Sequence, residues 1–437
     1  MKCYADRLMT RVSQSEPSGI PKDTERVPMR AVDRALATKR DYLVPCVYHF
    51  YQNPPVLVKG EGAYLFDSEG KRYLDCFAGV TVMNAGHSNP VILEAAIEQL
   101  KQLQHTTSVY LTEPVLELAR AVAELTPKGL RRSFFCASGS EANEGALMLA
   151  ALATHRPNVV SLDGGLHGRT KAAMNANGLE MWRTDPFPLG DYLRAPGPRD
   201  PESLSVIETM LRTGRVAAVI AEPIQGNGGI VVPPEGYWLE LRRLCSQYGT
   251  LLIADEVQTA WNRTGRWFTC EHWGVTPDIV TVAKALGNGF PIAAYITTDE
   301  LASAYTRPGA ATFGGNLVAC QAALATLRFH QDQRLGQRSQ LLGQHLMRQL
   351  EELQKRHSII AEVRGRGLMI GVELQAKSIE VAGLTDRVLE KMKDAGYLLG
   401  KCGPGRNVLA FLPPLVVDQV DLDRMIDDLD RVFATVA

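Results

Sequence analysis

Two stretches of this 437-residue chain decide its fold: Leu251-Leu252-Ile253-Ala254-Asp255-Glu256-Val257-Gln258 and Asp278-Ile279-Val280-Thr281-Val282-Ala283-Lys284-Ala285-Leu286-Gly287-Asn288-Gly289. Each is an apolar, β-branched run that stops at a polar residue, which is typical of a buried parallel strand. The first run ends at Asp255, and Lys284 follows the second. Because ligands in open parallel sheets bind beyond the carboxyl ends of the strands, we expect these two side chains to share one site.

A lysine beside a carboxylate at this edge of a sheet meets the requirements of pyridoxal phosphate chemistry. The amine can form a Schiff base, and the carboxylate can keep the pyridine nitrogen protonated. Both residues also have a structural interpretation, since Asp255 could cap a turn and Lys284 could be a solvated surface residue. The glycines at 287 and 289 let backbone crowd the lysine, which favours the catalytic interpretation.

A third segment predicts a phosphate site. Phe134-Phe135-Cys136 leads into Ala137-Ser138-Gly139-Ser140-Glu141-Ala142-Asn143 and an alanine-rich helix. Gly139 permits close backbone approach, Ser140 is expected to cap the helix, and the helix N-terminus favours an anion. An ordinary capped helix has the same pattern, so this segment indicates a cofactor only together with Lys284.

Composition limits the class of protein. With 45% hydrophobic residues the chain can bury a large core, and its length predicts two or three folding units. A formal net charge of -1 argues against nucleic acid or an anionic membrane as the main partner, and the longest apolar runs are too short to span a membrane. The eight cysteines contain no CxxC pair, so we expect neither a disulfide framework nor a metal site, and a cytoplasmic location fits best.

Strands and helices alternate through the middle of the chain, which predicts an α/β fold with a mostly parallel, doubly wound sheet. The predicted strands are 132–136, 158–162, 216–221, 250–254, 279–282 and 292–296. An antiparallel meander over 56–75 precedes them, and a helix over 334–355 opens a smaller α+β part. We therefore predict an N-terminal arm and small-domain segment at 1–75, a large cofactor-binding domain at 76–327, and a C-terminal small domain at 328–437.

Four motifs occur in order along the chain: Ala221-Glu222-Pro223-Ile224-Gln225-Gly226, Asp255-Glu256-Val257-Gln258-Thr259, Lys284-Ala285-Leu286-Gly287-Asn288-Gly289 and Thr312-Phe313-Gly314-Gly315-Asn316. With them, residues 51–432 resemble the class III aminotransferases of pyridoxal-phosphate fold type I. The alanine–glyoxylate type 2 and ω-aminotransferase branch looks closest.

The resemblance implies a role for each matching cofactor-binding residue. Lys284 matches the Schiff-base lysine, Asp255 the partner of the ring nitrogen, and Gln258 the partner of the ring hydroxyl. Gly139 and Ser140 match the phosphate-binding turn.

Two further matches are less direct. Glu222 matches an acid behind the ring that supports Gln258, although a buried salt bridge is an alternative. Thr312 matches a threonine that reaches the phosphate of the neighbouring subunit. The resemblance therefore implies an obligate homodimer with shared active sites.

Departures from the family pattern bear on the substrate. Many relatives that act on amino acids have an arginine for the α-carboxylate where this chain has Ala410. Relatives acting on ornithine or 4-aminobutyrate often have a glutamate that pairs with this arginine, where this chain has Asn227. Arg169 stands at the position that, in relatives acting on 4-aminobutyrate or acetylornithine, holds the remote acidic group. Arg183 is a weaker candidate for a second anion contact. Either arginine could instead be an ordinary surface residue.

These residues predict amino transfer from a terminal amine with a remote acidic group, an ω-amino acid or an aminophosphonate, to a small 2-oxo acid such as pyruvate or glyoxylate. Two alternatives stay open. Some members of this family are lyases that release ammonia from phosphate- or phosphonate-bearing amines, and the missing arginine is compatible with that reaction. A noncatalytic nucleotide-binding scaffold is disfavoured because no GxGxxG follows an early strand.

Overall fold

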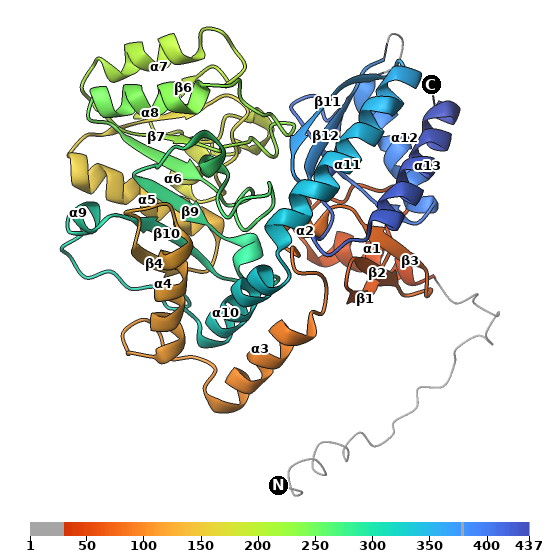
Figure 1. Cartoon of the computed structure of the whole chain (residues 1–437), viewed down its shortest axis with the longest axis horizontal. Coiled ribbons are helices and arrows are strands. Elements are labelled where there is room, and N and C mark those ends of the chain that lie inside the picture. Colours follow the sequence, from red (N-terminus) through yellow and green to blue (C-terminus); the bar gives the residue numbers. More distant parts are fainter. Residues whose placement is uncertain (1–29, 377–379, 437) are drawn as a thin grey trace, which may run out of the picture. The chain divides into compact units, whose positions relative to one another are not determined.

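The computed structural model describes residues 30–376 and 380–436, and its elements carry the labels of Figure 1. Contacts divide the chain into two units, Met1–Tyr48 and His49–Ala437. In the first unit the described residues form helix α1, Ala31–Tyr42. All other elements belong to the second unit. The three-part division predicted from the sequence is not tested by these contacts and stays a prediction.

A seven-stranded sheet is the centre of the second unit, with strand order β4-β10-β9-β8-β7-β5-β6. All neighbouring pairs are parallel except those of β10, which runs antiparallel to both β4 and β9. The mostly parallel α/β fold is therefore confirmed. The strands are β4 Arg132–Cys136, β5 Asn158–Leu162, β6 Tyr192–Ala195, β7 Val216–Ala221, β8 Leu251–Asp255, β9 Ile279–Val282 and β10 Ala293–Thr297; all but β6 were predicted, to within one residue.

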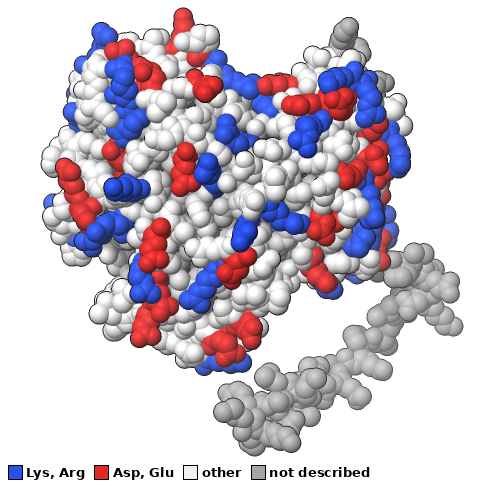
Figure 2. Space-filling view, viewed as in Figure 1, with Lys and Arg blue, Asp and Glu red and all other residues white. Residues whose placement is uncertain are grey.

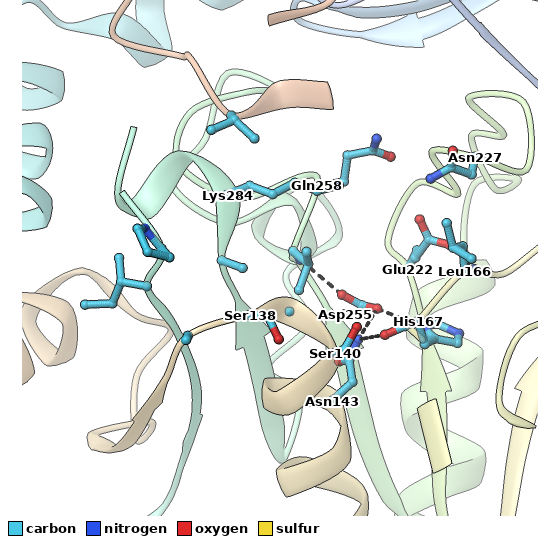
Figure 3. A pocket seen from close by; sticks show the side chains of 18 of the residues that line it. Ser138, Ser140, Asn143, Leu166, His167, Glu222, Asn227, Asp255, Gln258 and Lys284 are labelled. Atoms are coloured by element: carbon cyan, nitrogen blue, oxygen red, sulfur yellow. Dashed lines mark hydrogen bonds and ion pairs between the residues drawn. The ribbon is translucent and has the colours of Figure 1, made fainter. Parts of the chain in front are cut away.

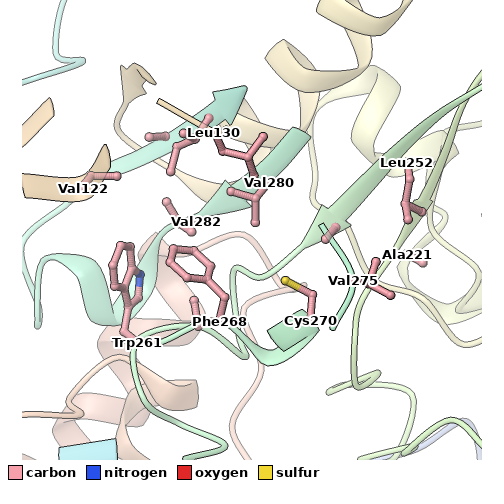
Figure 4. Close-up of a cluster of buried hydrophobic side chains, with 14 of the residues drawn as sticks. Val122, Leu130, Ala221, Leu252, Trp261, Phe268, Cys270, Val275, Val280 and Val282 are labelled. Carbon is pink, nitrogen blue, oxygen red and sulfur yellow. The ribbon is translucent and has the colours of Figure 1, made fainter. Parts of the chain in front are cut away.

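Helices cover both faces of this sheet because its strands are apolar on both sides. Along β7, Val219 and Ala221 belong to one core cluster, whereas Ala218 and Ile220 belong to another, as the two-residue period of a strand requires. The first cluster, part of which is drawn in Figure 4, packs against α4, α7 and α8, and the second packs against α5. The helices are α3 Pro90–Gln102, α4 Glu113–Leu125, α5 Gly139–Thr154, α6 Lys171–Asn175, α7 Ser203–Leu211, α8 Tyr237–Gln247, α9 Asp299–Ala302 and α10 Leu317–Asp332.

Helix α5 begins earlier than its sequence suggested. The hydroxyl of Ser138 accepts the backbone N–H of Glu141, and the carboxylate of Glu141 accepts the N–H of Ser138 at 3.0 Å. This capping box starts the helix at Gly139, so the expectation that Ser140 caps it is wrong. Ser140 lies inside the first turn, where its side chain is available for another partner.

Two four-stranded sheets complete the second unit: β1-β2-β3-β13 and the antiparallel β11-β12-β15-β14. The first contains the predicted meander, with β1 Leu57–Glu61, β2 Tyr64–Asp67, β3 Arg72–Asp75 and β13 Tyr397–Leu398. The second consists of β11 Ile360–Arg366, β12 Met369–Leu374, β14 Gly400–Cys402 and β15 Val408–Phe411. One apolar core joins both sheets to α11 Leu335–Arg356, α12 Val381–Asp394 and α13 Gln419–Val436.

Several short helical segments occur within the loops. Segment α2, Ala78–Thr81, has positive φ angles throughout, and three 3-10 turns occur at η1 Glu180–Trp182, η2 Thr269–Trp273 and η3 Lys284–Leu286. Across residues 30–376 and 380–436, no helix is long and apolar enough to cross a membrane. Acidic and basic side chains are interspersed on the face drawn in Figure 2.

Candidate functional site

A cavity of about 380 Å³ lies where strands of the large sheet end. Each predicted residue in its wall lies at the carboxyl end of a strand or in the segment that follows one, so the sheet delivers polar groups to one edge, as the sequence predicted. Figure 3 shows these side chains around the same space. Six of the nine predicted site residues line the cavity: Gly139, Ser140, Glu222, Asp255, Gln258 and Lys284.

Lys284 opens the turn η3, two residues beyond the end of β9. Its φ is 48°, a value that few residues other than glycine adopt, so the surrounding loop determines its backbone. Burial lowers the pKa of the amine, and the carboxylates of Glu222 and Asp255 act in the opposite direction. A lowered pKa increases the neutral fraction of the amine, which is the form that attacks a carbonyl and accepts a proton.

Asp255 ends β8 with its side chain 2% exposed. Its Oδ2 accepts hydrogen bonds from Nδ1 of His167 at 2.7 Å and from Nδ2 of Asn143 at 2.8 Å. Its Oδ1 accepts the backbone N–H of Val257 at 3.1 Å. These donors compensate the buried charge and hold the carboxylate in one orientation.

His167 and Asn143 are candidate site residues that the sequence reasoning missed. Both line the cavity, and Asn143 also donates to the backbone carbonyl of His167 at 2.6 Å. The Nε2 of His167 is buried and has no hydrogen-bond partner within the described residues. A signal was present in the sequence, because His167 follows a predicted strand and Asn143 lies one turn beyond Ser140 on the same helix face.

The start of α5 forms a second side of the cavity. The first N–H groups of a helix have no acceptor within the helix, so this end favours a phosphate. A Cβ atom on Gly139 would lie 2.8 Å from Cγ1 of Val257, so a larger residue here would displace the Val257 side chain. The hydroxyl of Ser140 accepts the backbone N–H of Arg169 at 3.1 Å, which ties the loop after β5 to this helix end.

Glu222 and Gln258 lie on the other side. The carboxylate of Glu222 accepts the N–H groups of Leu166 at 2.8 Å and Gly226 at 2.9 Å. Burial raises the pKa of Glu222 to about 7, with His167 lowering it and Asp255 raising it further.

We expected Glu222 to contact and support Gln258. Among the described residues there is no hydrogen bond between these two side chains. Gly226 lies between them instead, and a Cβ atom on it would lie 1.2 Å from Oε1 of Gln258. That oxygen is buried without a hydrogen-bond partner in the described part of the chain.

The remaining predicted residues lie outside this cavity. Thr312 lines a neighbouring cavity of about 660 Å³, which shares Ala137 with the first. Arg169 is exposed and Arg183 is half-buried, and neither is among the described residues that line the first cavity. The roles of these three residues stay predictions.

Comparison with known families decides the class of protein. The family model described as aminotransferase class-III matches residues 49–433. The chain belongs to this family. An alanine–glyoxylate aminotransferase 2 homologue of Arabidopsis thaliana, described as mitochondrial, is 38% identical to it over 92% of this chain and 87% of that protein. An acetylornithine aminotransferase of Methanocaldococcus jannaschii is 39% identical over 88% and 94% of the two chains.

Solved structures agree with this membership. The ornithine aminotransferase of Toxoplasma gondii, whose structure is described as having partial occupancy of pyridoxal phosphate, superimposes with a TM-score of 0.85. It is 29% identical and covers 92% of this chain and 94% of its own. A transaminase of Virgibacillus has a TM-score of 0.87 at 26% identity, over 92% and 99% of the two chains.

This class III aminotransferase is therefore an enzyme that depends on pyridoxal 5'-phosphate. The cavity suits that cofactor, because it combines a buried amine, a buried carboxylate and a helix N-terminus for the phosphate. Unpartnered polar atoms of His167 and Gln258 in its wall are further sites for polar contacts. When bound, the cofactor supplies a ring that withdraws electrons from the substrate carbon.

Proposed function

We propose that this aminotransferase moves the amino group of a terminal amine with a remote acidic group, an ω-amino acid or an aminophosphonate, to a small 2-oxo acid such as pyruvate or glyoxylate. The proposal is based on the residues that surround Ala410. Ala410 is 1% exposed within a cluster with Ile224, Ile230, Met369 and Leu412, so an apolar core fills the place where relatives have their α-carboxylate arginine. Among the described residues that line the cavity, Lys284 is the sole lysine or arginine.

The acidic group of such a donor needs a cation elsewhere. Arg169 directly follows Gly168, which lines the cavity, and its backbone is fixed on Ser140. Its exposed guanidinium has no acceptor among the described residues. We assign the remote acid to Arg169, with Arg183 as a second anion contact, because a planar guanidinium binds carboxylate and phosphonate oxygens in pairs.

In this proposal the amine of Lys284 would hold the cofactor and would act as the base and acid that moves the proton of the substrate. Asp255 would keep the ring nitrogen protonated, and His167 with Asn143 fixes the Asp255 carboxylate. Gly139 and Ser140 would hold the phosphate, and Gln258 would hold the ring hydroxyl. Leu166 and Val257 line the same space and exclude water from it.

A homodimer with shared sites is part of the proposal. Val109, Tyr110, Leu111 and Phe313 are 74%, 69%, 89% and 62% exposed. The segments that carry them are adjacent, since the rings of His105 and Phe313 lie 5.2 Å apart. Such a patch is typical of a protein interface, and Thr312 lies beside it. A second copy would cover the patch and bring Thr312 toward the partner's phosphate site.

The cellular location belongs to the proposal as well. The cytoplasm is the location that the sequence predicted, and the seven cysteines of the described residues, all free, are compatible with any reducing compartment.

A donor screen tests the function. The holoenzyme is incubated with 4-aminobutyrate, β-alanine or 2-aminoethylphosphonate, with and without pyruvate, and both alanine and ammonium are measured. We expect alanine in amounts equal to the donor consumed, and without pyruvate no alanine, no ammonium and at most one equivalent of donor consumed per active site. Ammonium release that does not depend on pyruvate would show a lyase and overturn the proposal.

A matched pair of donors tests the acid site. In the Arg169→Gln enzyme we expect the donor 4-aminobutyrate to have a KM at least about tenfold higher, the size of one lost charged hydrogen bond. The donor n-butylamine, which lacks the acid, should keep its wild-type KM. An equal effect on both donors would exclude Arg169 as the acid-binding residue.

A further inference from the structure

The loop from Gln225 to Val231 lies between the cofactor cavity and the sheet β11-β12-β15-β14, here called the C-terminal sheet. It closes on itself through two hydrogen bonds between the backbones of these two residues. Within it, Ile230 has a φ of 54°. A β-branched residue in the left-handed region is strained, so contacts from outside the loop must hold it in this form.

On its inner side the loop touches the cavity. Asn227 lines it, and the N–H of Gly226 donates to Oε2 of Glu222 at 2.9 Å. Because Gly226 has no side chain, the amide of Gln258 packs directly against the loop. A shift of this loop would therefore move the amides of Asn227 and Gln258 relative to the cavity.

On its outer side Arg364 of β11 contacts the loop. The Arg364 side chain is 7% exposed, and its Nε donates to the carbonyl of Gly229 at 2.9 Å. Its Nη1 donates to Glu362 at 2.7 Å and to Glu373 at 2.5 Å. A buried guanidinium with two carboxylates is held in a fixed orientation, so the contact with Gly229 is a rigid one.

One further contact reaches the loop, and another lies just after its end. The N–H of Gly403, which follows β14, donates to the backbone carbonyl of Asn227 at 2.9 Å. Arg199 donates to both oxygens of Glu362, at 2.9 and 2.8 Å, and its Nε donates to the carbonyl of Val232 at 3.2 Å. The sheet β11-β12-β15-β14 and the residue after β14 thus hold the loop at Asn227 and Gly229, and Arg199 joins Glu362 of the sheet to Val232 just beyond the loop.

We propose that Arg364 is a positioning residue for the aminotransferase reaction. It holds the strained loop in place from the C-terminal sheet, and the loop fixes Gln258 beside the cofactor and Asn227 beside the substrate. Cofactor retention and substrate affinity then depend on Arg364, a residue that is not among those that line the cavity.

Arg364→Lys tests this positioning in the holoenzyme. A lysine keeps the positive charge beside Glu362 and Glu373, but its single nitrogen cannot reproduce the separate Nε and Nη contacts. We expect cofactor loss on dilution, followed by visible absorbance, to become about tenfold faster, the size of one lost charged hydrogen bond. The KM for the amine donor should rise by a similar factor, while kcat changes less than about twofold.

Arg356→Lys is the matched control. Arg356 pairs with Asp430 on the surface of the same part of the chain and does not contact the loop within the described residues. This change should leave cofactor release and KM as in the wild type, because an exposed ion pair contributes little to stability. If Arg364→Lys behaves like this control, Arg364 is merely structural and the proposal is wrong.

Gly229→Ala tests the same contact from the loop side and does not depend on the folding of the Arg364 variant. The added Cβ would lie 3.1 Å from Nη2 of Arg364, at a φ of 113°. It should displace the loop and reproduce the faster cofactor release and the raised KM. Unchanged values in a folded Gly229→Ala enzyme would also overturn the proposal.

Discussion

The Nδ1 of His167 lies 2.7 Å from Oδ2 of Asp255, and both side chains are buried. The two residues are 88 positions apart in the chain. A hydrogen bond from a ring fixed in the protein interior restricts the carboxylate to one rotamer, so the charge of Asp255 faces the cavity in a defined direction.

His167→Leu should therefore lower kcat by about tenfold to a hundredfold at saturating cofactor, the range found when supporting hydrogen bonds to a functional group are lost. His167→Asn should keep most of the activity, since its Nδ2 can donate from nearly the same place as Nδ1 of histidine. Steady-state kinetics of both variants provide the test. Equal losses in the two would show that the ring itself, and not its donor, is needed.

Lys284→Ala should lower kcat by at least about a hundredfold, because general acid–base catalysis by a positioned side chain contributes that much or more. After borohydride reduction the wild type should retain covalently bound cofactor by intact mass, and the variant should not. Turnover that survives this substitution would contradict the assignment of the catalytic amine.

Gly226→Ala should displace the amide of Gln258, since the new Cβ would overlap its Oε1 and the flexible side chain can move away. We expect faster cofactor release with little change in Tm. The double variant with Gln258→Ala should release cofactor no faster than Gln258→Ala alone, because both changes remove the same contact. Additive effects would show that Gly226 acts through another group.

The free energy of unfolding should depend on pH through the titration of Glu256. Burial raises the pKa of this fully buried carboxyl group to about 7, although hydrogen bonds from Thr259 and Cys270 act to lower it. The folded state then keeps its proton at a pH where the unfolded chain has lost it, so this contribution to stability is present at low pH and is lost as the pH rises toward 7.

Glu256→Gln removes that titration. The free energy of unfolding, measured with urea at pH 5, 6 and 7, should fall less steeply with pH in this variant than in the wild type. Glu98→Gln, at an exposed position, should leave the wild-type slope unchanged. A Glu256→Gln enzyme with the wild-type slope would show that this carboxyl group is ionised throughout.

The exposed patch beside Thr312 predicts the behaviour of surface variants. Leu111→Asp and Phe313→Glu should shift the enzyme toward monomers in light scattering coupled to size exclusion, because burying a charge in an apolar interface is costly. Activity should fall with the dimer fraction. Phe187→Glu, at a residue 78% exposed outside this patch, is the control and should change neither. Dimers that persist in all three variants would place the interface elsewhere.

Much of the fold could be predicted from the sequence because buried parallel strands carry continuous apolar runs. The apolar runs before Asp255 and Lys284 predicted the ends of strands β8 and β9 to within one residue. Because these two strands are neighbours in the sheet, the two side chains lie at the same edge. Strand β6, Tyr192–Ala195, was missed because this four-residue segment at the sheet edge includes an exposed arginine and resembles a loop.

The orientation of side chains could not be predicted in the same way. Ser138 and Ser140 are both suitable caps for α5, and only the position of the first helical turn decides between them. The contacts of Glu222 could not be predicted either. Its carboxylate accepts the N–H groups of Gly226 and Leu166, whereas the sequence had suggested a contact with Gln258.

By itself, the sequence determined the α/β class and the placement of Lys284 and Asp255 at one sheet edge, because apolar periodicity and strand ends are local properties of the chain. The family followed from motifs that resemble those of class III aminotransferases. Only the tertiary structure decided which groups surround them. Asn143 and Asp255 are 112 positions apart, and Arg364 and Gly229 are 135 apart. Hydrogen bonds over such separations depend on distances of a few tenths of an ångström, which packing of the whole domain sets and no local pattern encodes.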